Sequence, residues 1–267
     1  MKYVICDMDG TLLDSNKRLP NKLFAVIEEL KKQNVCFGAA SGRQYFNLYQ
    51  QFGEYAKDML FIAENGGILY EGETPLFADK ITPEELRPVI DQARACPNAY
   101  PILCGVNSAY LETQDDEFLK NAHMYYHRLK IVDDLMDVLS KDQIAKVAIF
   151  DKDNAETNSY PLISPHTGRL RAVVSGKEWI DVSNPDVSKG KAIKILKQKY
   201  QLSSDDFVVF GDFMNDYEMM KECTYSYAMA NAHPDLKKVC HYEALSNDED
   251  GVMKAVCALF DLDYEAL

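Results

Sequence analysis

Short apolar segments alternate with segments of helical period near both ends of the chain. Near the start, apolar residues at 3–6 and 35–40 flank a segment whose apolar side chains recur at helical spacing. The same alternation returns late in the chain, where a predicted helix at 189–200 precedes an apolar strand at 207–210. Strands that alternate with helices form a parallel sheet covered by helices on both faces. The sequence therefore predicts an α/β fold.

Between residues 82 and 186 the regular alternation of strands and helices is lost. This segment opens on a helix start, where Thr82 can cap the helix and Glu85 completes a capping box. Helical stretches and strand-like segments follow, the latter around Tyr110 and at 147–150, 170–174 and 179–182. We therefore predict an α+β module inserted into the first fold. This divides the chain into a core of residues 1–81 and 187–267 and an insert of residues 82–186.

The charge and the cysteine content limit the possible partners. The net charge of −13 comes from 42 acidic and 29 basic residues, and such a surface repels nucleic acids and anionic membranes. The seven cysteines include no Cys-x-x-Cys pair, which favours reduced thiols over disulfides or zinc. We see neither a signal-peptide core nor a membrane span. We expect a cytoplasmic protein in which any phosphate site carries its own local positive charge.

Polar residues follow three of the predicted strands. Asp7 and Asp9 follow the first strand, Ser41 follows the second, and Asp212 follows the strand at 207–210. In a parallel sheet, ligands bind at the carboxyl ends of the strands. Carboxylates that converge there are costly unless a cation lies among them, and an all-oxygen ligand set suits Mg²⁺ better than Zn²⁺. The sequence therefore predicts a Mg²⁺ site, at which one Asp could attack and the other could transfer protons.

The neighbouring residues can steady this site and hold a phosphate. Gly10 permits a tight turn, and Thr11 can hydrogen-bond the loop. Ser41, Gly42 and Arg43 precede a predicted helix, where a hydroxyl and backbone N–H groups form an anion cradle. Taken alone, the segment that ends in Asp9-Gly10 is also compatible with a simple Asp-Gly turn after a buried strand. Taken alone, Ser41-Gly42 is also compatible with a turn that begins a helix.

Lys189 lies at the start of a predicted helix, where its charge opposes the helix dipole. A lysine at such a position makes better sense if it faces a bound phosphate. Asp212 would ligate the metal directly. Asn215 and Asp216, on the next turn, could orient the metal ligands and Lys189.

Taken in order, these residues resemble the four motifs of the haloacid dehalogenase-like superfamily. The motifs are Asp7-Met8-Asp9-Gly10-Thr11, Ser41-Gly42, Lys189 and Gly211-Asp212-x-x-Asn215-Asp216. The long insertion resembles that of the Cof-type subfamily, as do the segments at 63–67 and 247–252. The resemblance covers essentially the whole chain. It implies a Rossmann-like core under a large type-two cap, residues 82–186, that governs substrate specificity.

The resemblance also implies an activity and a set of roles. The activity is Mg²⁺-dependent hydrolysis of small phosphorylated metabolites, such as sugar phosphates, through an aspartyl phosphate. Asp7 would be the nucleophile and a metal ligand, and Asp9 would be the general acid/base, with its backbone carbonyl on the metal. Asp212 would complete the protein ligands. The phosphoryl group would be held by Thr11, Ser41, Gly42, Arg43, Lys189 and Asn215, with Asp216 supporting the ligands from behind.

Two other functions remain open. A phosphomutase would use the same core residues and would differ only in water access to the aspartyl phosphate. A non-catalytic phosphate-binding regulator is the second alternative, because receiver domains also use clustered Asp residues with a Ser or Thr and a Lys; such domains are about half as long. The sequence names neither the substrate nor the oligomeric state. His123 and His127, four apart in a predicted helix of the insert, are expected to be solvated or to face substrate rather than to bind metal.

Overall fold

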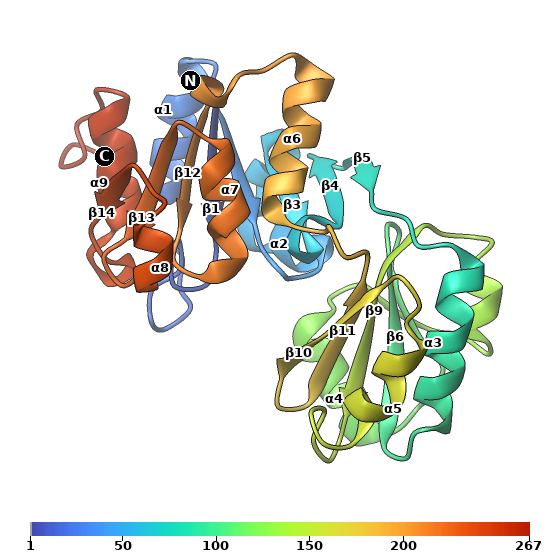
Figure 1. Cartoon of the computed structure of the whole chain (residues 1–267). Coiled ribbons are helices and arrows are strands. Elements are labelled where there is room, and N and C mark those ends of the chain that lie inside the picture. Colours follow the sequence, from blue (N-terminus) through green and yellow to red (C-terminus); the bar gives the residue numbers. More distant parts are fainter. Residues whose placement is uncertain (1) are drawn as a thin grey trace. The chain divides into compact units, whose positions relative to one another are not determined.

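The computed structural model describes residues 2–267 and divides the chain into two compact units (Figure 1). The core unit comprises residues 2–42, Leu48–Thr74 and Ser188–Leu267. The insert unit comprises Arg43–Asn47 and Pro75–Val187. The short segment after Gly42 thus groups with the insert. The assignment of a catalytic role to one unit and a cap role to the other stays a prediction.

An eight-stranded sheet has the order β14-β13-β12-β1-β2-β3-β4-β5, and it belongs to the core unit except for most of its edge strand β5. Its strands from β14 to β3 are parallel, and β4 runs antiparallel to β3. The strands are β1 (Tyr3–Asp7), β2 (Cys36–Ala40), β3 (Leu60–Ala63), β4 (Ile68–Glu71), β5 (Thr74–Ala78), β12 (Phe207–Gly211), β13 (Tyr225–Met229) and β14 (Tyr242–Ala244).

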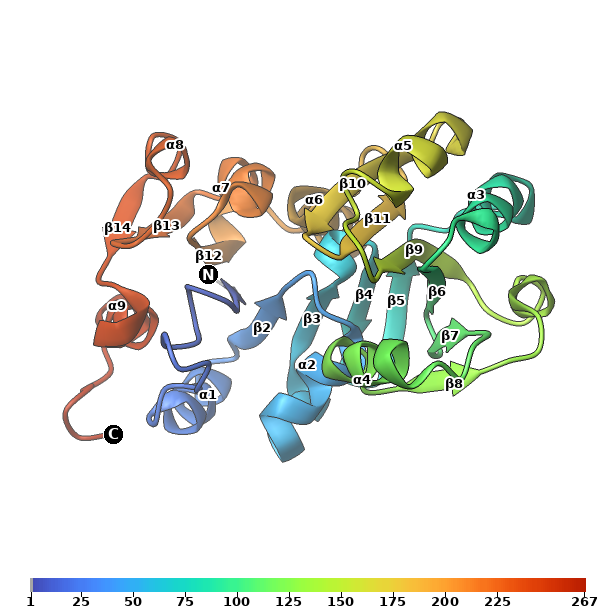
Figure 2. The ribbon, with the colours of Figure 1, turned by 90° about the horizontal axis from the view of Figure 1, so that it is seen from below.

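Helices cover both faces of the parallel strands, and this confirms the predicted fold class. Helices α1 (Leu23–Lys32) and α9 (Gly251–Leu259) lie on one face, and α6 (Lys189–Tyr200) and α7 (Tyr217–Glu222) lie on the other (Figure 2). Because both faces are covered, β1 and β12 are apolar runs without polar alternation. The remaining helices of this part are α2 (Tyr45–Phe52), α8 (Pro234–Lys237) and 3₁₀ turns at Gly53–Asp58, Glu64–Gly66, Ser204–Asp206, Met214–Asp216 and Asn247–Glu249.

The insert unit contains a six-stranded sheet with the order β10-β11-β9-β6-β7-β8. Only the β7–β8 pair is parallel among the pairings described. The strands are β6 (Ala99–Gly105), β7 (Ala109–Leu111), β8 (Leu129–Ile131), β9 (Ile144–Asp151), β10 (Arg171–Gly176) and β11 (Trp179–Ser183). The sequence interpretation identified four of these strands and missed β6 and β8.

Helices pack on both faces of this second sheet. Helices α3 (Pro83–Ala95) and α5 (Ser159–Ile163) bury one face, and α4 (Asp116–Tyr125) packs over β6 and β9 on the other. The predicted capping box of α3 is present. Because α4 ends at Tyr125, the expectation that His123 and His127 share a helix is wrong. Two 3₁₀ turns, Leu135–Val138 and Ser164–His166, complete the unit.

Two further expectations concern the cysteines and membranes. All seven cysteines are free, as the sequence predicted, and five of them are buried. Within residues 2–267, no helix is long and apolar enough to cross a lipid bilayer.

Candidate active site

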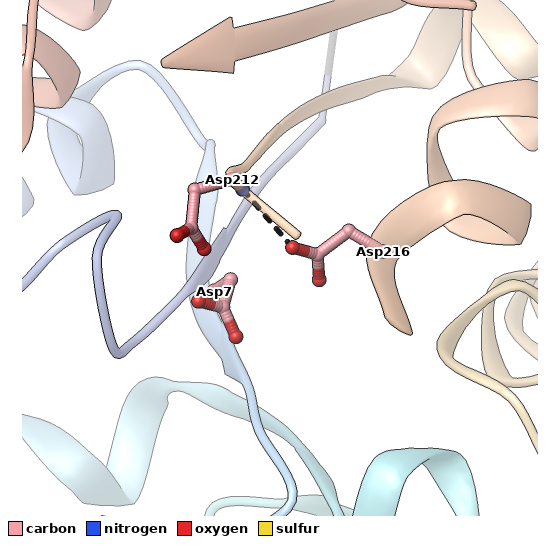
Figure 3. Close-up of side chains that lie close together, drawn as sticks. All are labelled: Asp7, Asp212 and Asp216. Carbon is pink, nitrogen blue, oxygen red and sulfur yellow. Dashed lines mark hydrogen bonds between the residues drawn. The ribbon is translucent and has the colours of Figure 1, made fainter. Parts of the chain in front are cut away.

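Three carboxylates converge at the carboxyl edge of the core sheet. Asp7 is the last residue of β1, and Asp212 directly follows the neighbouring parallel strand β12, so both side chains emerge at one edge. Asp216 joins them from the turn that precedes α7. One oxygen from each of the three lies within 4.8 Å of the others (Figure 3). The expected meeting of Asp7 and Asp212 is present, although the third carboxylate belongs to Asp216 and not to Asp9.

Lys189 lies among these carboxylates. It is the first residue of α6, whose N-terminus is capped by the Ser188 side chain. Its Nζ donates to Oδ1 of Asp7 at 2.5 Å and to Oδ1 of Asp216 at 2.6 Å. The side chains of Lys189 and Asp216 are fully buried. The lysine is therefore held at an unfavourable end of the helix dipole by two anionic partners, which explains its position.

The cluster carries more negative than positive charge, and the pKa values reflect this excess. Burial raises the pKa of Asp7 to about 7, against the opposing attraction of Lys189. Burial and the charge of Asp7 raise the pKa of Asp212 to about 6. Burial alone would lower the pKa of Lys189, but Asp216 and Asp7 outweigh it and raise the pKa. Three acids around one ammonium are a donor set that a divalent cation would stabilise.

The loop after β1 is shaped to fit against Asp212. Gly10 has φ +80°, and a Cβ there would lie 2.3 Å from Oδ2 of Asp212, so the position requires glycine on two counts. The Thr11 hydroxyl donates to Oδ1 of Asp212 at 3.2 Å. The side chain of Asn231 donates to the Gly10 carbonyl at 2.8 Å. The predicted tight turn is present, whereas the Thr11 hydroxyl bonds to Asp212 and not to the loop itself.

The side chain of Asp9 does not belong to the group of three carboxylates, although its charge acts on Asp212. The Asp9 side chain is 41% exposed, and Oδ1 accepts a hydrogen bond from Nζ of Lys17 at 2.9 Å. Solvent can therefore exchange protons with this carboxylate. A surface pair of this kind contributes only about 0–1 kcal/mol, so Lys17 can be displaced at little cost.

Ser41 and Gly42 belong to a connected group that includes Asn65. The backbone N–H of Asn65 donates to the Ser41 carbonyl at 2.9 Å, and a Cβ at Gly42 would lie 3.0 Å from the Asn65 amide nitrogen. Asn215 donates to Oδ1 of Asn65 at 3.2 Å. The sequence reasoning gave Asn65 no role. The signal in the sequence was the segment at 63–67, which resembles the Cof-type subfamily. In the structure, Asn65 has a left-handed φ of 54°, which marks an unusual turn. Arg43, by contrast, groups with the insert unit.

Asp216 accepts hydrogen bonds from three other residues at the site. Its Oδ2 accepts from the backbone N–H of Asp212 at 3.1 Å, drawn as the dashed line in Figure 3, and from that of Phe213 at 3.3 Å. Its other oxygen accepts from Lys189. Asp216 therefore ties the Asp212 backbone to the lysine. This agrees with the expectation that it orients Lys189, whereas Asn215 bonds to Asn65 instead.

Comparison with known proteins shows the family to which the chain belongs. Residues 4–256 match the model of a family described as haloacid dehalogenase-like hydrolase. The chain belongs to this family. It is 33% identical to the 5-amino-6-(5-phospho-D-ribitylamino)uracil phosphatase YbjI of Escherichia coli, over 96% of this chain and 95% of the relative. It is 26% identical to the HMP-PP phosphatase of Cronobacter sakazakii, over 86% and 84% of the two chains.

Solved structures of the haloacid dehalogenase-like fold agree with this assignment. A protein from Thermotoga maritima superposes with a TM-score of 0.85 at 25% identity, over 96% of both chains. A haloacid dehalogenase-like hydrolase from Bacteroides thetaiotaomicron gives a TM-score of 0.84 at 20% identity, over 97% and 99% of the two chains, and shows the shared fold alone. The family match and the curated phosphatases together make this chain a phosphoric monoester hydrolase of the Cof type.

Proposed function

We propose that the protein is a Mg²⁺-dependent phosphatase of small phosphorylated metabolites that works through an aspartyl phosphate on Asp7. The observation that carries the proposal is the buried contact of Lys189 with Asp7 inside a group of three carboxylates. The relatives support the substrate class. The E. coli relative is named for a phosphoribityl derivative of uracil, and the Cronobacter relative is named for HMP-PP.

The donor set fits a hard divalent cation. Asp7 and Asp212, with the backbone carbonyl of Asp9, would hold Mg²⁺, and Asp216 would orient Asp212 and Lys189 from behind. Bound Mg²⁺ supplies positive charge that lets an anionic nucleophile and an anionic phosphate approach each other. An all-oxygen set with one lysine nearby fits this role better than it fits zinc.

Asp7 performs the first chemical step in this proposal. A carboxylate oxygen of Asp7 attacks phosphorus, the ester P–O bond breaks, and the electron pair leaves with the organic oxygen. Lys189 favours the ionised form of Asp7 and partly offsets the effect of burial on its pKa, because its ammonium donates directly to the carboxylate. Asp9 protonates the departing oxygen, and its partly exposed side chain suits a group that exchanges protons.

Water completes the cycle. Asp9, now ionised, takes a proton from a water molecule that attacks the phosphorus of the aspartyl phosphate. The bond between phosphorus and the Asp7 oxygen then breaks, which frees inorganic phosphate and restores the carboxylate. Thr11, Ser41, Gly42, Arg43, Lys189 and Asn215 would hold the phosphoryl oxygens, and the insert would select the organic group.

The decisive experiment is phosphate release from a panel of phosphorylated metabolites, with Mg²⁺ and with EDTA, for the wild type and for Asp7→Asn. We expect release for one group of compounds, lost in both controls. Sustained release by a clean preparation of Asp7→Asn would contradict the proposal. An isomerised sugar phosphate without free phosphate would identify a mutase, and a single phosphate per chain would identify a regulator.

A further inference from the structure

The turn after β3 has an unusual backbone. Glu64, Asn65 and Gly66 have φ angles of 50°, 54° and 99°. Residues other than glycine seldom adopt this left-handed region, because Cβ then comes too close to the following carbonyl oxygen. Two consecutive non-glycine residues in such a conformation are costly, and residues held in this way cluster at functional sites. The conformation of this turn therefore points to a role beyond the connection of β3 to β4.

The turn contacts three segments that the proposed phosphate site uses. The backbone N–H of Asn65 donates to the Ser41 carbonyl at 2.9 Å. A Cβ at Gly66 would collide with the backbone of Ser188, the residue that caps α6. The side chain of Asn215 donates to Oδ1 of Asn65 at 3.2 Å. All these residues belong to the core unit, so the contacts lie within one compact body.

The side chain of Asn65 keeps a donor group that no protein atom uses. Its Oδ1 is occupied by Asn215, and this fixes the orientation of the amide. A Cβ at Gly42 would lie 3.0 Å from Nδ2 of Asn65, so this nitrogen lies beside the Gly42 backbone. Within residues 2–267, Nδ2 has no hydrogen-bond acceptor, and Asn65 is half-buried. A donor in such a position is costly unless water or a ligand accepts from it.

We propose that Asn65 is an additional phosphate-binding residue. Its Nδ2 donates to a phosphoryl oxygen held at Ser41 and Gly42, while its Oδ1 holds Asn215. Donors that are in place before the substrate arrives stabilise the charge on the phosphoryl oxygens without reorganisation. Gly42 leaves room for the Asn65 amide, because it has no side chain. This inference rests on the proposed phosphatase function and adds one residue to its anion-binding set.

Variants at position 65 separate the side chain from the backbone. Asparagine tolerates a left-handed φ better than most residues, so the backbone alone could favour it. Asn65→Gly keeps this conformation accessible and removes only the side chain. Asn65→Asp keeps an acceptor for Asn215 and replaces the free donor by an anionic oxygen. Asn34→Gly is the matched control, because Asn34 is an exposed asparagine of the core unit with φ 58°.

Binding of inorganic phosphate is the first measurement, because it requires no turnover. We would titrate the full-length protein with phosphate in the presence of Mg²⁺ and follow the heat of binding. Asn65→Gly is expected to bind phosphate about ten-fold more weakly, as is typical for loss of a hydrogen bond to a charged group. Asn65→Asp should bind still more weakly, because its carboxylate repels the anion. Asn34→Gly should bind like the wild type, and melting curves report whether each variant is folded.

A second pair of variants tests whether Asn65 acts on the phosphate itself or only through Asn215. In the Asn215→Ala background, Asn65→Gly is expected to weaken phosphate binding by about a further ten-fold. No further effect in that background would mean that Asn65 only positions Asn215, which would refute the direct contact.

The outcomes distinguish this inference from the proposed function. Equal phosphate binding by the wild type and Asn65→Gly would refute the role of Asn65, and so would an equal loss in Asn34→Gly. Loss of phosphate release from metabolites in Asp7→Asn would still support the phosphatase in both cases. Weaker phosphate binding by Asn65→Gly, in a protein that hydrolyses no metabolite, would leave the role of Asn65 intact and overturn the phosphatase.

Discussion

Lys189 and Asp216 are both fully buried, and the ammonium of one donates to the carboxylate of the other at 2.6 Å. Asp216 also accepts from the backbone N–H groups of Asp212 and Phe213. One carboxylate therefore links the lysine on α6 to the residue that follows β12. The position of Asp212 depends on this link, because the segment after β12 has to turn toward Asp7.

Removal of Asp216 tests this link. Asp216→Ala leaves a buried ammonium with one partner fewer and two backbone donors without their acceptor, and we expect it to lower the free energy of unfolding by about 3–5 kcal/mol. Urea denaturation measures the effect. Asp235→Ala, which removes an exposed partner of Lys238, is the control and should change stability little. Equal effects of the two substitutions would contradict a structural role for the buried pair.

A second prediction concerns the turn at Gly10. In Gly10→Ala the new Cβ would collide with Oδ2 of Asp212 and the residue would keep a positive φ, so we expect loss of both stability and phosphate release. Gly53→Ala is a matched control, because Gly53 also has a positive φ but has open space around its Cβ position. It should show the backbone strain alone, about 1 kcal/mol or slightly more. A Gly10 variant no worse than the Gly53 variant would show that the contact with Asp212 is unimportant.

Mg²⁺ should stabilise the protein in a pH-dependent way. Asp7 and Asp212 have pKa values raised from 3.8 to about 7 and about 6, so the folded metal-free protein keeps protons that the unfolded chain releases. The metal-free protein therefore loses stability as the pH rises from near the unfolded value through this range, and the loss levels off above about pH 7. Since Mg²⁺ competes with those protons, its stabilising effect should grow over the same interval.

Melting temperatures with Mg²⁺ and with EDTA, measured from about pH 5 to about pH 8, check this prediction. Asp212→Asn should abolish most of the difference between the two conditions. The same Mg²⁺ effect at both ends of the pH range would argue against a site built from these two carboxylates.

Asp9 is predicted to act through its side chain. Asp9→Asn keeps the backbone carbonyl but removes the acid/base, and we expect phosphate release to fall by about 10²–10⁴-fold. Rapid-quench assays of phosphate release measure it. Lys17→Met, which removes only the surface partner of Asp9, should change the rate little. A mild effect of Asp9→Asn, comparable to that of Lys17→Met, would remove Asp9 from the mechanism.

The elements predicted correctly are those with strong local patterns. Helix α1 has its apolar side chains on one face, β1 and β12 are uninterrupted apolar runs, and α3 begins with a capping box. Strand β6 was missed because Pro101 interrupts it, and β8 was missed because it has only three residues, two of them exposed.

The sequence by itself determined the α/β class, the positions of the four motifs and the residue types that can hold a cation and a phosphate. Only the tertiary structure decided that Asp216, and not the Asp9 side chain, completes the cluster with Asp7 and Asp212. It also decided that Asn65 lies beside Gly42 and Asn215. Local patterns record which side chains are buried and with what period. The meeting of residues about 200 positions apart depends on strand order and register, which the packing of the whole chain selects.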